Sequence, residues 1–309
     1  MISSKITLKQ LEALIWVADL KSFRKAADHL RTTQPNVSAR ISGLEEALGQ
    51  TLLVRDSGAV RPTGDAEPVL RAARKAVAAA EGVLEAANRA DLVDTPLRLG
   101  VTEMVACTWL RPFLRALSDR YPHVSVDLTV DLSADLGKAL EGHALDLAIQ
   151  SAPFSGGASG DIALGTYPYV WVAAPVWAGR LSAGSDLQAL ANRAIVTHAR
   201  HTTAVRALDA ELKSRRIKDA RIISSSSLTL AMQMTLDGLG AGLLPKAMVA
   251  ADVQANRLVV VAADWLPPPL EFAARFHADA ASLLIAASAQ LAAEIAASHD
   301  QENLSTSSK

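Results

Sequence analysis

The sequence predicts an α/β protein in three parts: a small helical unit, one long helix, and a two-lobed region of alternating strands and helices. Two short helical patterns separated by a polar corner lie between residues 22 and 53. An alanine-rich helical pattern follows from about residue 65 to residue 90. From residue 97 onward, strand patterns alternate with helix patterns, which is typical of parallel sheets joined by right-handed crossovers.

Length and composition limit the class of protein. The 309 residues suit two or three domains, and 50% of them are hydrophobic, enough for sizeable cores. No apolar run reaches the ~20 residues that span a bilayer, and no signal peptide is recognised. Cys107 is the single cysteine, which excludes a disulfide or a two-cysteine redox switch within one chain. We therefore expect a cytoplasmic protein without a membrane partner.

Charge is distributed unevenly although the net charge is only −1. Residues 1–62 contain nine Lys or Arg and six Asp or Glu, an excess of three positive charges. This mild excess would bind phosphates well only if two copies of the N-terminal unit added their contacts.

The residues from 22 to 53 predict a helix-turn-helix, packed on a preceding helix at about residues 8–18. Ser22 is a suitable N-cap for the first helix of the pair. Pro35 suits the start of the second helix, and Gly49 suits its end. Their apolar faces would be formed by Phe23, Ala26, Ala27 and Leu30, and by Val37, Ile41, Leu44 and Leu48. The second helix of such a motif can enter the major groove of DNA.

Side chains outside these apolar faces favour contact with DNA. Gln34, Asn36 and Ser38 can bond base edges in a groove. Residues 51–55 and 60–63 predict a two-stranded wing, and we expect its Arg55 and Arg61, together with Arg40, to contact phosphates or the minor groove. The alternative is a helical corner of an ordinary enzyme with solvated polar faces.

This region resembles the LysR-type transcriptional regulators. The matching residues are Phe23, Ala26, Ala27, Leu30, Thr33, Gln34, Pro35, Val37, Ser38, Ile41, Leu44, Glu45, Leu48, Gly49, Leu52, Arg55, Thr63 and Gly64. The resemblance adds Thr33 and Pro35 to the expected DNA-binding residues and implies double-stranded promoter DNA as a partner. Family members usually carry arginine directly after the Val-Ser pair, whereas this chain has Ala39 followed by Arg40.

The long helix lacks a core of its own to lie on and needs a partner. The resemblance makes it a linker helix that pairs two subunits, which would suit an inverted-repeat DNA site. The resemblance also implies a homotetramer and adds RNA polymerase as a candidate partner. The alternative is a solvated spacer helix.

A hinge at residues 91–96 precedes the two-lobed region. Predicted strands lie at 97–101, 124–130, 145–149, 169–174, 194–197, 221–224, 258–261 and 270–275. Predicted helices lie at 105–120, 135–141, 187–191, 204–215, 228–239, from 243 onward and at 280–297. The predicted domains are thus 1–64, 65–91 and 92–300, with lobe I at about 97–166 and 267–299, lobe II at about 167–266, and an unstructured tail from residue 300. Two lobes joined by crossovers resemble periplasmic binding proteins, the architecture that the family uses as an effector domain.

Polar residues follow several predicted strands, where ligands of parallel sheets bind. Helix N-termini there favour an anion. Arg200 and His201 could pair a carboxylate, so we expect a small organic acid that also carries a hydrogen-bond donor. The expected contacts are Thr102, Glu103, Asp131, Ser133, Gln150, Arg200, His201, Thr202, Ser225 and Ser226. The alternative for each Ser or Thr is a plain helix N-cap, and Glu103 and Asp131 could instead cap their own helices.

Two other classes of protein remain as rivals. A stand-alone solute-binding protein with a helical module would need a signal peptide. An enzyme that uses the same cleft would need a nucleophile and a base, and the sequence has no Gly-x-Ser-x-Gly elbow, while Gly238–Gly242 lacks the dinucleotide spacing. We expect no catalytic residue, no cofactor and no metal. His198 and His201 are taken as loop residues, Trp109 and Phe154 as core residues, and Cys107 as a buried small apolar residue.

Overall fold

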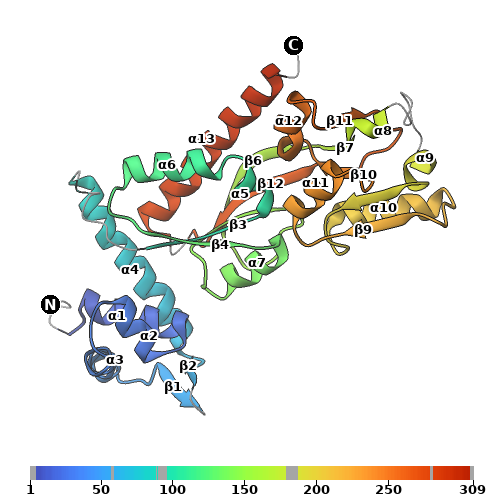
Figure 1. The fold of residues 1–309 in the computed structure, drawn as a ribbon. Helices are drawn as coiled ribbons and strands as arrows, with labels where there is room; N and C mark the ends of the chain where they lie inside the picture. Colours follow the sequence, from blue (N-terminus) through green and yellow to red (C-terminus); the bar gives the residue numbers. More distant parts are fainter. Residues whose placement is uncertain are drawn as a thin grey trace.

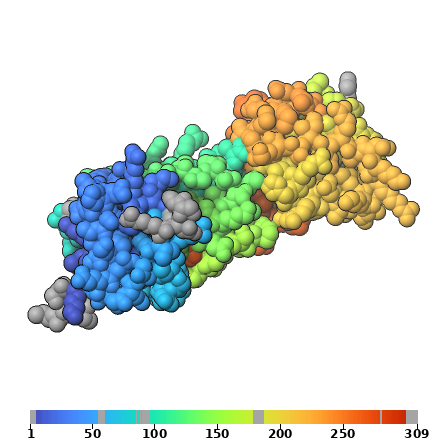
Figure 2. Space-filling view, turned by 90° about the horizontal axis from the view of Figure 1, so that it is seen from below, coloured from blue at the N-terminus to red at the C-terminus, as the bar shows by residue number. Residues whose placement is uncertain are grey.

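The computed structural model describes residues 5–56, 59–87, 89, 96–178, 187–278 and 281–306. The molecule is elongated, with the helix-turn-helix unit at one end and the second lobe of the α/β region at the other (Figures 1 and 2). The predicted fold class is confirmed: an N-terminal helical unit with a wing, a long helix, and two mixed α/β lobes. None of the helices in the described part of the chain combines the length and the hydropathy of a membrane-spanning segment.

The N-terminal unit consists of three helices and a two-stranded wing. The helices are α1 (Leu8–Leu20), α2 (Phe23–His29) and α3 (Gln34–Leu48), and the wing pairs β1 (Leu53–Asp56) with β2 (Ala59–Pro62) in antiparallel register. The Ser22 hydroxyl caps α2 by accepting a hydrogen bond from the Lys25 amide at 3.3 Å. Gly49 ends α3 with φ of 69°, a left-handed conformation that glycine adopts without strain.

Glu45 fixes the wing to α3. One carboxylate oxygen of Glu45 accepts hydrogen bonds from the backbone amides of Leu52, at 2.7 Å, and Leu53, at 3.1 Å. The Leu52 side chain is fully buried in the core between the helices. The position of the wing therefore follows the position of α3.

Helix α4 (Ala66–Ala86) connects the N-terminal unit to the α/β region and packs along α1 (Figure 1). Leu70 and Ala73 of α4 are buried, while Arg74 forms a two-point ion pair with Asp19 of α1. Residues 91–95 of the predicted hinge lie outside the described residues. The predicted domain boundaries stay a prediction.

The first lobe is a five-stranded sheet in the order β4-β3-β5-β12-β6. Strands β3 (Leu97–Val101), β4 (Val126–Val130) and β5 (Leu147–Ser151) are parallel, as predicted. Strand β12 (Leu270–Phe276) pairs antiparallel with β5, and β6 (Gly160–Tyr167) pairs antiparallel with β12. Helices α6 (Leu110–Arg120) and α13 (Leu283–Thr306) cover one face and α7 (Ser133–Glu141) covers the other (Figure 1).

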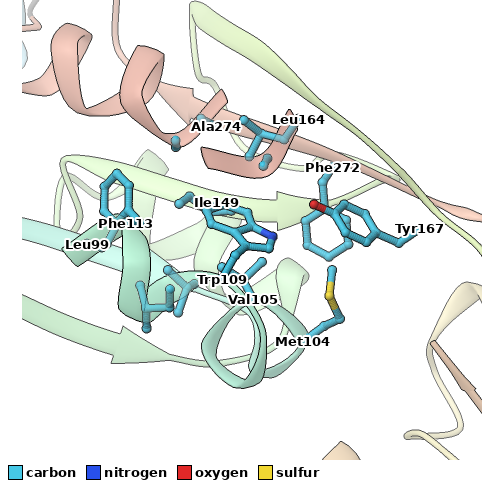
Figure 3. Packing of buried hydrophobic residues seen from close by; sticks show 14 of the residues in the cluster. Leu99, Met104, Val105, Trp109, Phe113, Ile149, Leu164, Tyr167, Phe272 and Ala274 are labelled. Carbon is cyan, nitrogen blue, oxygen red and sulfur yellow. The ribbon is translucent and has the colours of Figure 1, made fainter. Parts of the chain in front are cut away.

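The core of the first lobe forms between α6, α13 and the sheet. Figure 3 shows Trp109 and Phe113 beside Leu99 and Ile149. Trp109 is fully buried, so the prediction that it is a core residue is confirmed. Phe154 is instead 40% exposed, and the guanidinium of Arg275 lies 5.2 Å from its ring, so its core prediction was wrong.

The second lobe is a five-stranded sheet in the order β11-β7-β10-β8-β9. Its strands are β7 (Tyr169–Ala173), β8 (Ala194–Thr197), β9 (Arg221–Ser224), β10 (Ala241–Pro245) and β11 (Val259–Val261). Its helices are α8 (Pro175–Ala178), α9 (Leu187–Ala191), α10 (Thr203–Ser214), α11 (Leu228–Leu236) and α12 (Lys246–Gln254). The chain passes between the lobes at Pro168 and again between β11 and β12.

Several elements of the structure differ from the sequence prediction. Residues 243–245 belong to strand β10 rather than to the start of a helix, because all five β10 residues are buried and a short apolar run has no period that separates strand from helix. Strand β6 was missed at 160–167 because its burial is irregular. Helix α13 continues to Thr306, beyond the predicted start of an unstructured tail at residue 300, because an alanine-rich helix propagates cooperatively.

The predicted helix at 105–120 is two helices. The Thr108 hydroxyl donates to the Met104 carbonyl at 2.7 Å, and α5 (Glu103–Cys107) ends there before α6 begins at Leu110. A threonine hydroxyl that bonds a backbone carbonyl in this way competes with the backbone hydrogen bonds that would continue the helix. Cys107 is exposed at the end of α5, so its prediction as a buried residue was wrong.

Candidate functional sites

The N-terminal end of α3 forms an exposed polar surface. Thr33, Gln34, Pro35 and Asn36 are all exposed, and the Asn36 amide donates to the Thr32 hydroxyl at 3.0 Å. Three apolar residues of the same helix, Val37, Ile41 and Leu44, are buried against α1 and α2. The helical period therefore separates a face held by the core from a face that is free to contact another molecule.

The remaining candidate DNA-binding residues lie around this surface. Ser38 and Arg40 are half-buried, and Arg40 is close enough to Glu12 of α1 to lower the pKa of that carboxyl, although burial dominates and raises it. Arg61 is exposed on strand β2 of the wing. Arg55 lies on β1, and its side chain is outside the described residues.

A cavity of about 450 Å³ lies between the two lobes. Its walls come from the ends of strands and the starts of helices α5, α7, α10 and α11, the location expected for ligands of parallel sheets. The predicted contacts that line it are Thr102, Glu103, Asp131, Ser133, His201, Thr202 and Ser226. Predicted contact residues from both lobes therefore line the same cavity.

Three predicted contacts do not line this cavity. Gln150 is fully buried beneath α7, because alternate residues of β5 point to opposite faces of the sheet, and neither of its amide atoms has a hydrogen-bond partner among the described residues. Arg200 is exposed outside the cavity. The Ser225 hydroxyl is used locally, where it accepts from the Ser227 amide at 3.0 Å.

Several lining residues were missed by the strand-end reasoning. Arg206 lies one turn inside α10, so it does not follow a strand directly. Tyr169, Leu270 and Phe272 belong to the strands that connect the lobes, and they give the cavity its apolar wall. Arg206 could have been predicted from its position one helical turn after the Thr202 cap. No local sequence feature indicated the residues of the apolar wall.

Glu103 caps a helix of the opposite lobe rather than its own. Its carboxylate accepts hydrogen bonds from the Ser227 hydroxyl at 2.9 Å and from the amides of Leu228, at 2.5 Å, and Thr229, at 3.0 Å. Burial raises the pKa of Glu103, but these hydrogen bonds outweigh burial and hold the pKa below its usual value. Glu103 therefore faces the other lobe as a carboxylate.

The hydroxyls of the cavity differ in their partners. Ser227 is a true N-cap, since its hydroxyl accepts from the Leu230 amide at 3.1 Å. Thr102 and Thr202 occupy N-cap positions without a capping hydrogen bond, and the Thr102 hydroxyl is buried without a partner among the described residues. His198 donates to the Ser226 carbonyl at 3.2 Å, and burial lowers the pKa of its ring.

A network of charged residues joins the N-terminal unit to the first lobe. Arg98 of β3 pairs with Asp146 at 2.5 Å and with Asp19 of α1 at 3.5 Å. Its guanidinium also lies 4.8 Å from the centre of the Trp16 ring, and it donates to the His143 carbonyl at 2.7 Å. Burial, followed by the charge of Arg74, lowers the pKa of His143 to about 4. The junction is thus held by buried ion pairs from three segments of the chain.

Comparisons with known proteins match both ends of the molecule. Residues 8–67 match the bacterial regulatory helix-turn-helix protein, lysR family, and residues 90–297 match the LysR substrate binding domain. The probable hydrogen peroxide-inducible genes activator of Streptomyces viridosporus is 31% identical over 255 residues, which cover 80% of each chain.

Two solved structures share the fold over nearly the full length. ArgP from Mycobacterium tuberculosis is 25% identical with a TM-score of 0.66, and the match covers 93% of this chain and 96% of ArgP. LysG from Corynebacterium glutamicum with bound effector Arg is 21% identical with a TM-score of 0.63, covering 95% and 99%. This chain is a member of the LysR family of DNA-binding transcriptional regulators, with an N-terminal helix-turn-helix and a C-terminal effector-binding domain.

Proposed function

We propose that the exposed end of α3 reads promoter DNA in the cytoplasm and that the wing contacts the adjacent backbone or minor groove. The observation that carries this proposal is the exposure of Thr33, Gln34, Pro35 and Asn36 above a buried apolar face. Gln34, Asn36 and Ser38 supply groups that bond base edges. Arg40, Arg55 and Arg61 supply guanidiniums for phosphates.

Replacement of Arg61 by alanine tests the role of the wing. We expect weaker binding to every DNA sequence and a decrease of about two in the slope of log K against log salt, because a bound dimer loses one phosphate contact from each of its two protomers. The measurement is a fluorescence anisotropy titration at several salt concentrations. A loss confined to one base position would contradict a phosphate role.

Helix α4 supports pairing with a second copy of the chain. Ala72, Ala76 and Ala79 are exposed and Val83 is 67% exposed, and their spacing of four, three and four places them on one face. This face is opposite Leu70, which is buried in the core of the N-terminal unit. Two such helices side by side would bury both stripes and present two α3 helices to an inverted-repeat site. Two such dimers would form a homotetramer, and the DNA-bound protein would contact RNA polymerase.

The Val83→Asp variant is expected to shift the protein toward monomers, because it replaces the largest apolar side chain of the stripe with a charge. We expect at least about a tenfold weaker dimer, as buried unpaired charges typically cost more than 1.4 kcal/mol. Sedimentation velocity over a concentration series measures the change. Val176→Asp, on α8 and 70% exposed, is the matched control. Equal dissociation constants for both variants would place the dimer contact elsewhere.

We further propose a small organic acid as the effector. The start of α10 offers free backbone amides and a partial positive charge, and Arg206 and His201 stand beside it in the cavity wall. The unpartnered Thr102 hydroxyl on the opposite wall can bond a polar group at the other end of the ligand, whereas the Ser133 hydroxyl accepts from the Ser151 amide at 2.9 Å. The bound arginine of LysG is one such molecule, a carboxylate with hydrogen-bond donors.

A thermal-shift screen of carboxylic acids tests the effector class. Amino, aromatic and aliphatic acids that raise the melting temperature of the wild type are expected to lose about tenfold or more in affinity in Arg206→Ala, because a charge-assisted hydrogen bond is removed. Arg111→Ala, an exposed arginine of α6 outside the cavity, is the matched control. Stabilisation only by cations or uncharged sugars would show that the effector is not an acid.

A further inference from the structure

The start of α11 is bound by a carboxylate of the protein itself. Glu103, at the first turn of α5 in the first lobe, crosses the cavity wall and accepts from the Ser227 hydroxyl and from two consecutive amides of α11 in the second lobe. One helical turn after Glu103, the Cys107 thiol lies 3.4 Å from the Thr229 hydroxyl. One face of α5 therefore packs against the first turn of α11.

This contact has the chemistry of a bound anion. Helix α11 has nine residues, and the amides of its first turn are among the four that lack a partner within the helix. Two of these amides donate to Glu103, and a third, from Leu230, donates to the Ser227 hydroxyl. Helix N-termini bind carboxylates in this way, through free amides and the positive end of the helix dipole. The anion position of α11 is thus taken by Glu103.

The other walls of the cavity divide by charge. Arg206, His201 and the start of α10 form a wall that attracts anions. Glu103 and Asp131 lie on the wall of the first lobe. Two carboxylates in this space disfavour a third one nearby, because like charges repel strongly where water is partly excluded.

We propose that Glu103 determines effector specificity: it acts as a built-in carboxylate ligand of α11, so the cavity accepts one effector carboxylate, at α10, and rejects a dicarboxylate. The proposal rests on the carboxylate effector proposed above. In this proposal a side chain of the first lobe, Glu103, limits which ligand groups can bind at the start of α11 in the second lobe. It also assigns the end of the ligand near Glu103 to neutral or cationic groups.

Chemical rescue tests the occupation of α11 without knowledge of the effector. Glu103→Ala removes the carboxylate that accepts from the Ser227 hydroxyl and from the amides of Leu228 and Thr229, and it leaves those two amides without an acceptor. We expect the variant to melt below the wild type, and acetate to raise its melting temperature more than chloride at equal ionic strength does. The wild type is expected to show no difference between acetate and chloride at the same concentrations.

Paired ligands of equal length test the selectivity. We expect calorimetry to show that the wild type binds hexanoate about tenfold or more tightly than adipate, and that this preference disappears or reverses in Glu103→Ala, where the second carboxylate of adipate can reach α11. Glu103→Gln, which keeps the length of the side chain but not its charge, is expected to retain folding and to show an intermediate ratio.

The outcomes separate the two proposals. Rescue by acetate together with a changed hexanoate-to-adipate ratio supports the role of Glu103. An unchanged ratio, no binding of either acid, or no rescue by acetate overturns it. Hexanoate that binds equally to the wild type and to Arg206→Ala contradicts the carboxylate position at α10, and in that case acetate rescue still reports on α11 alone.

Discussion

Replacement of Arg98 by alanine is expected to lower the free energy of unfolding by about 3–5 kcal/mol, because it leaves buried carboxylates without a counter-charge. The side chain of Arg98 is 11% exposed, that of Asp146 is 15% exposed and that of Asp19 is 2% exposed. Asp146 loses two hydrogen bonds from the guanidinium, at 2.5 and 3.0 Å. Asp19 keeps its ion pair with Arg74.

The effect is measured as a shift in melting temperature. For a domain of this size each kcal/mol corresponds to about 2–4 °C, so a decrease of about 6 °C or more is expected. Arg71→Ala is the matched control, since Arg71 and Glu67 form a surface ion pair at 3.7 Å with both side chains more than half exposed. A shift for Arg98→Ala no larger than that of the control would show that the junction is not held by these ion pairs.

The double variant Gln34→Ala, Asn36→Ala is expected to lose about a hundredfold or more in affinity for the specific site, because each base contact contributes about 1–3 kcal/mol and a dimer carries two copies. Binding to random DNA depends on phosphate contacts and is expected to change little. Both side chains are exposed, so the melting temperature should stay within a degree or two of the wild type.

Competition anisotropy with specific and random duplexes measures this loss of discrimination. Gln188→Ala is the matched control, an exposed glutamine on α9 at the far end of the molecule from α3 (Figure 2). Equal losses of affinity for the specific and the random duplex would indicate that Gln34 and Asn36 contact the DNA backbone rather than the bases. Unchanged discrimination would remove them from the recognition surface.

The fold was predictable where local signals agreed. Ser22, Pro35 and Gly49 mark the ends of α2 and α3 through backbone chemistry that needs no other part of the chain. The parallel strands of the first lobe follow from the alternation of strands and helices. Strand β10 was not predictable as a strand, because its burial between β7 and β8 is a property of the assembled sheet.

The effector cavity was predictable in location but less so in detail. Strand ends identified the polar wall from each lobe, since the position of a strand end depends only on topology, but they did not indicate the apolar wall. The role of Glu103 depends on a contact with Leu228 and Thr229, which lie more than a hundred residues away. Gln150 was misassigned because a one-residue shift along a strand turns a side chain to the other face. The Arg98 junction likewise joins Asp19 and Asp146 from distant segments, and nothing in the local sequence of Arg98 indicates it.

The most direct test of DNA recognition through α3 is a titration of the purified protein with a labelled duplex from the region upstream of its own gene. At low ionic strength we predict saturable binding that weakens steeply as salt is added, with unlabelled upstream DNA competing better than a random duplex of the same length. Equal competition by the two duplexes, or no binding at all to any upstream fragment at low salt, would contradict the account.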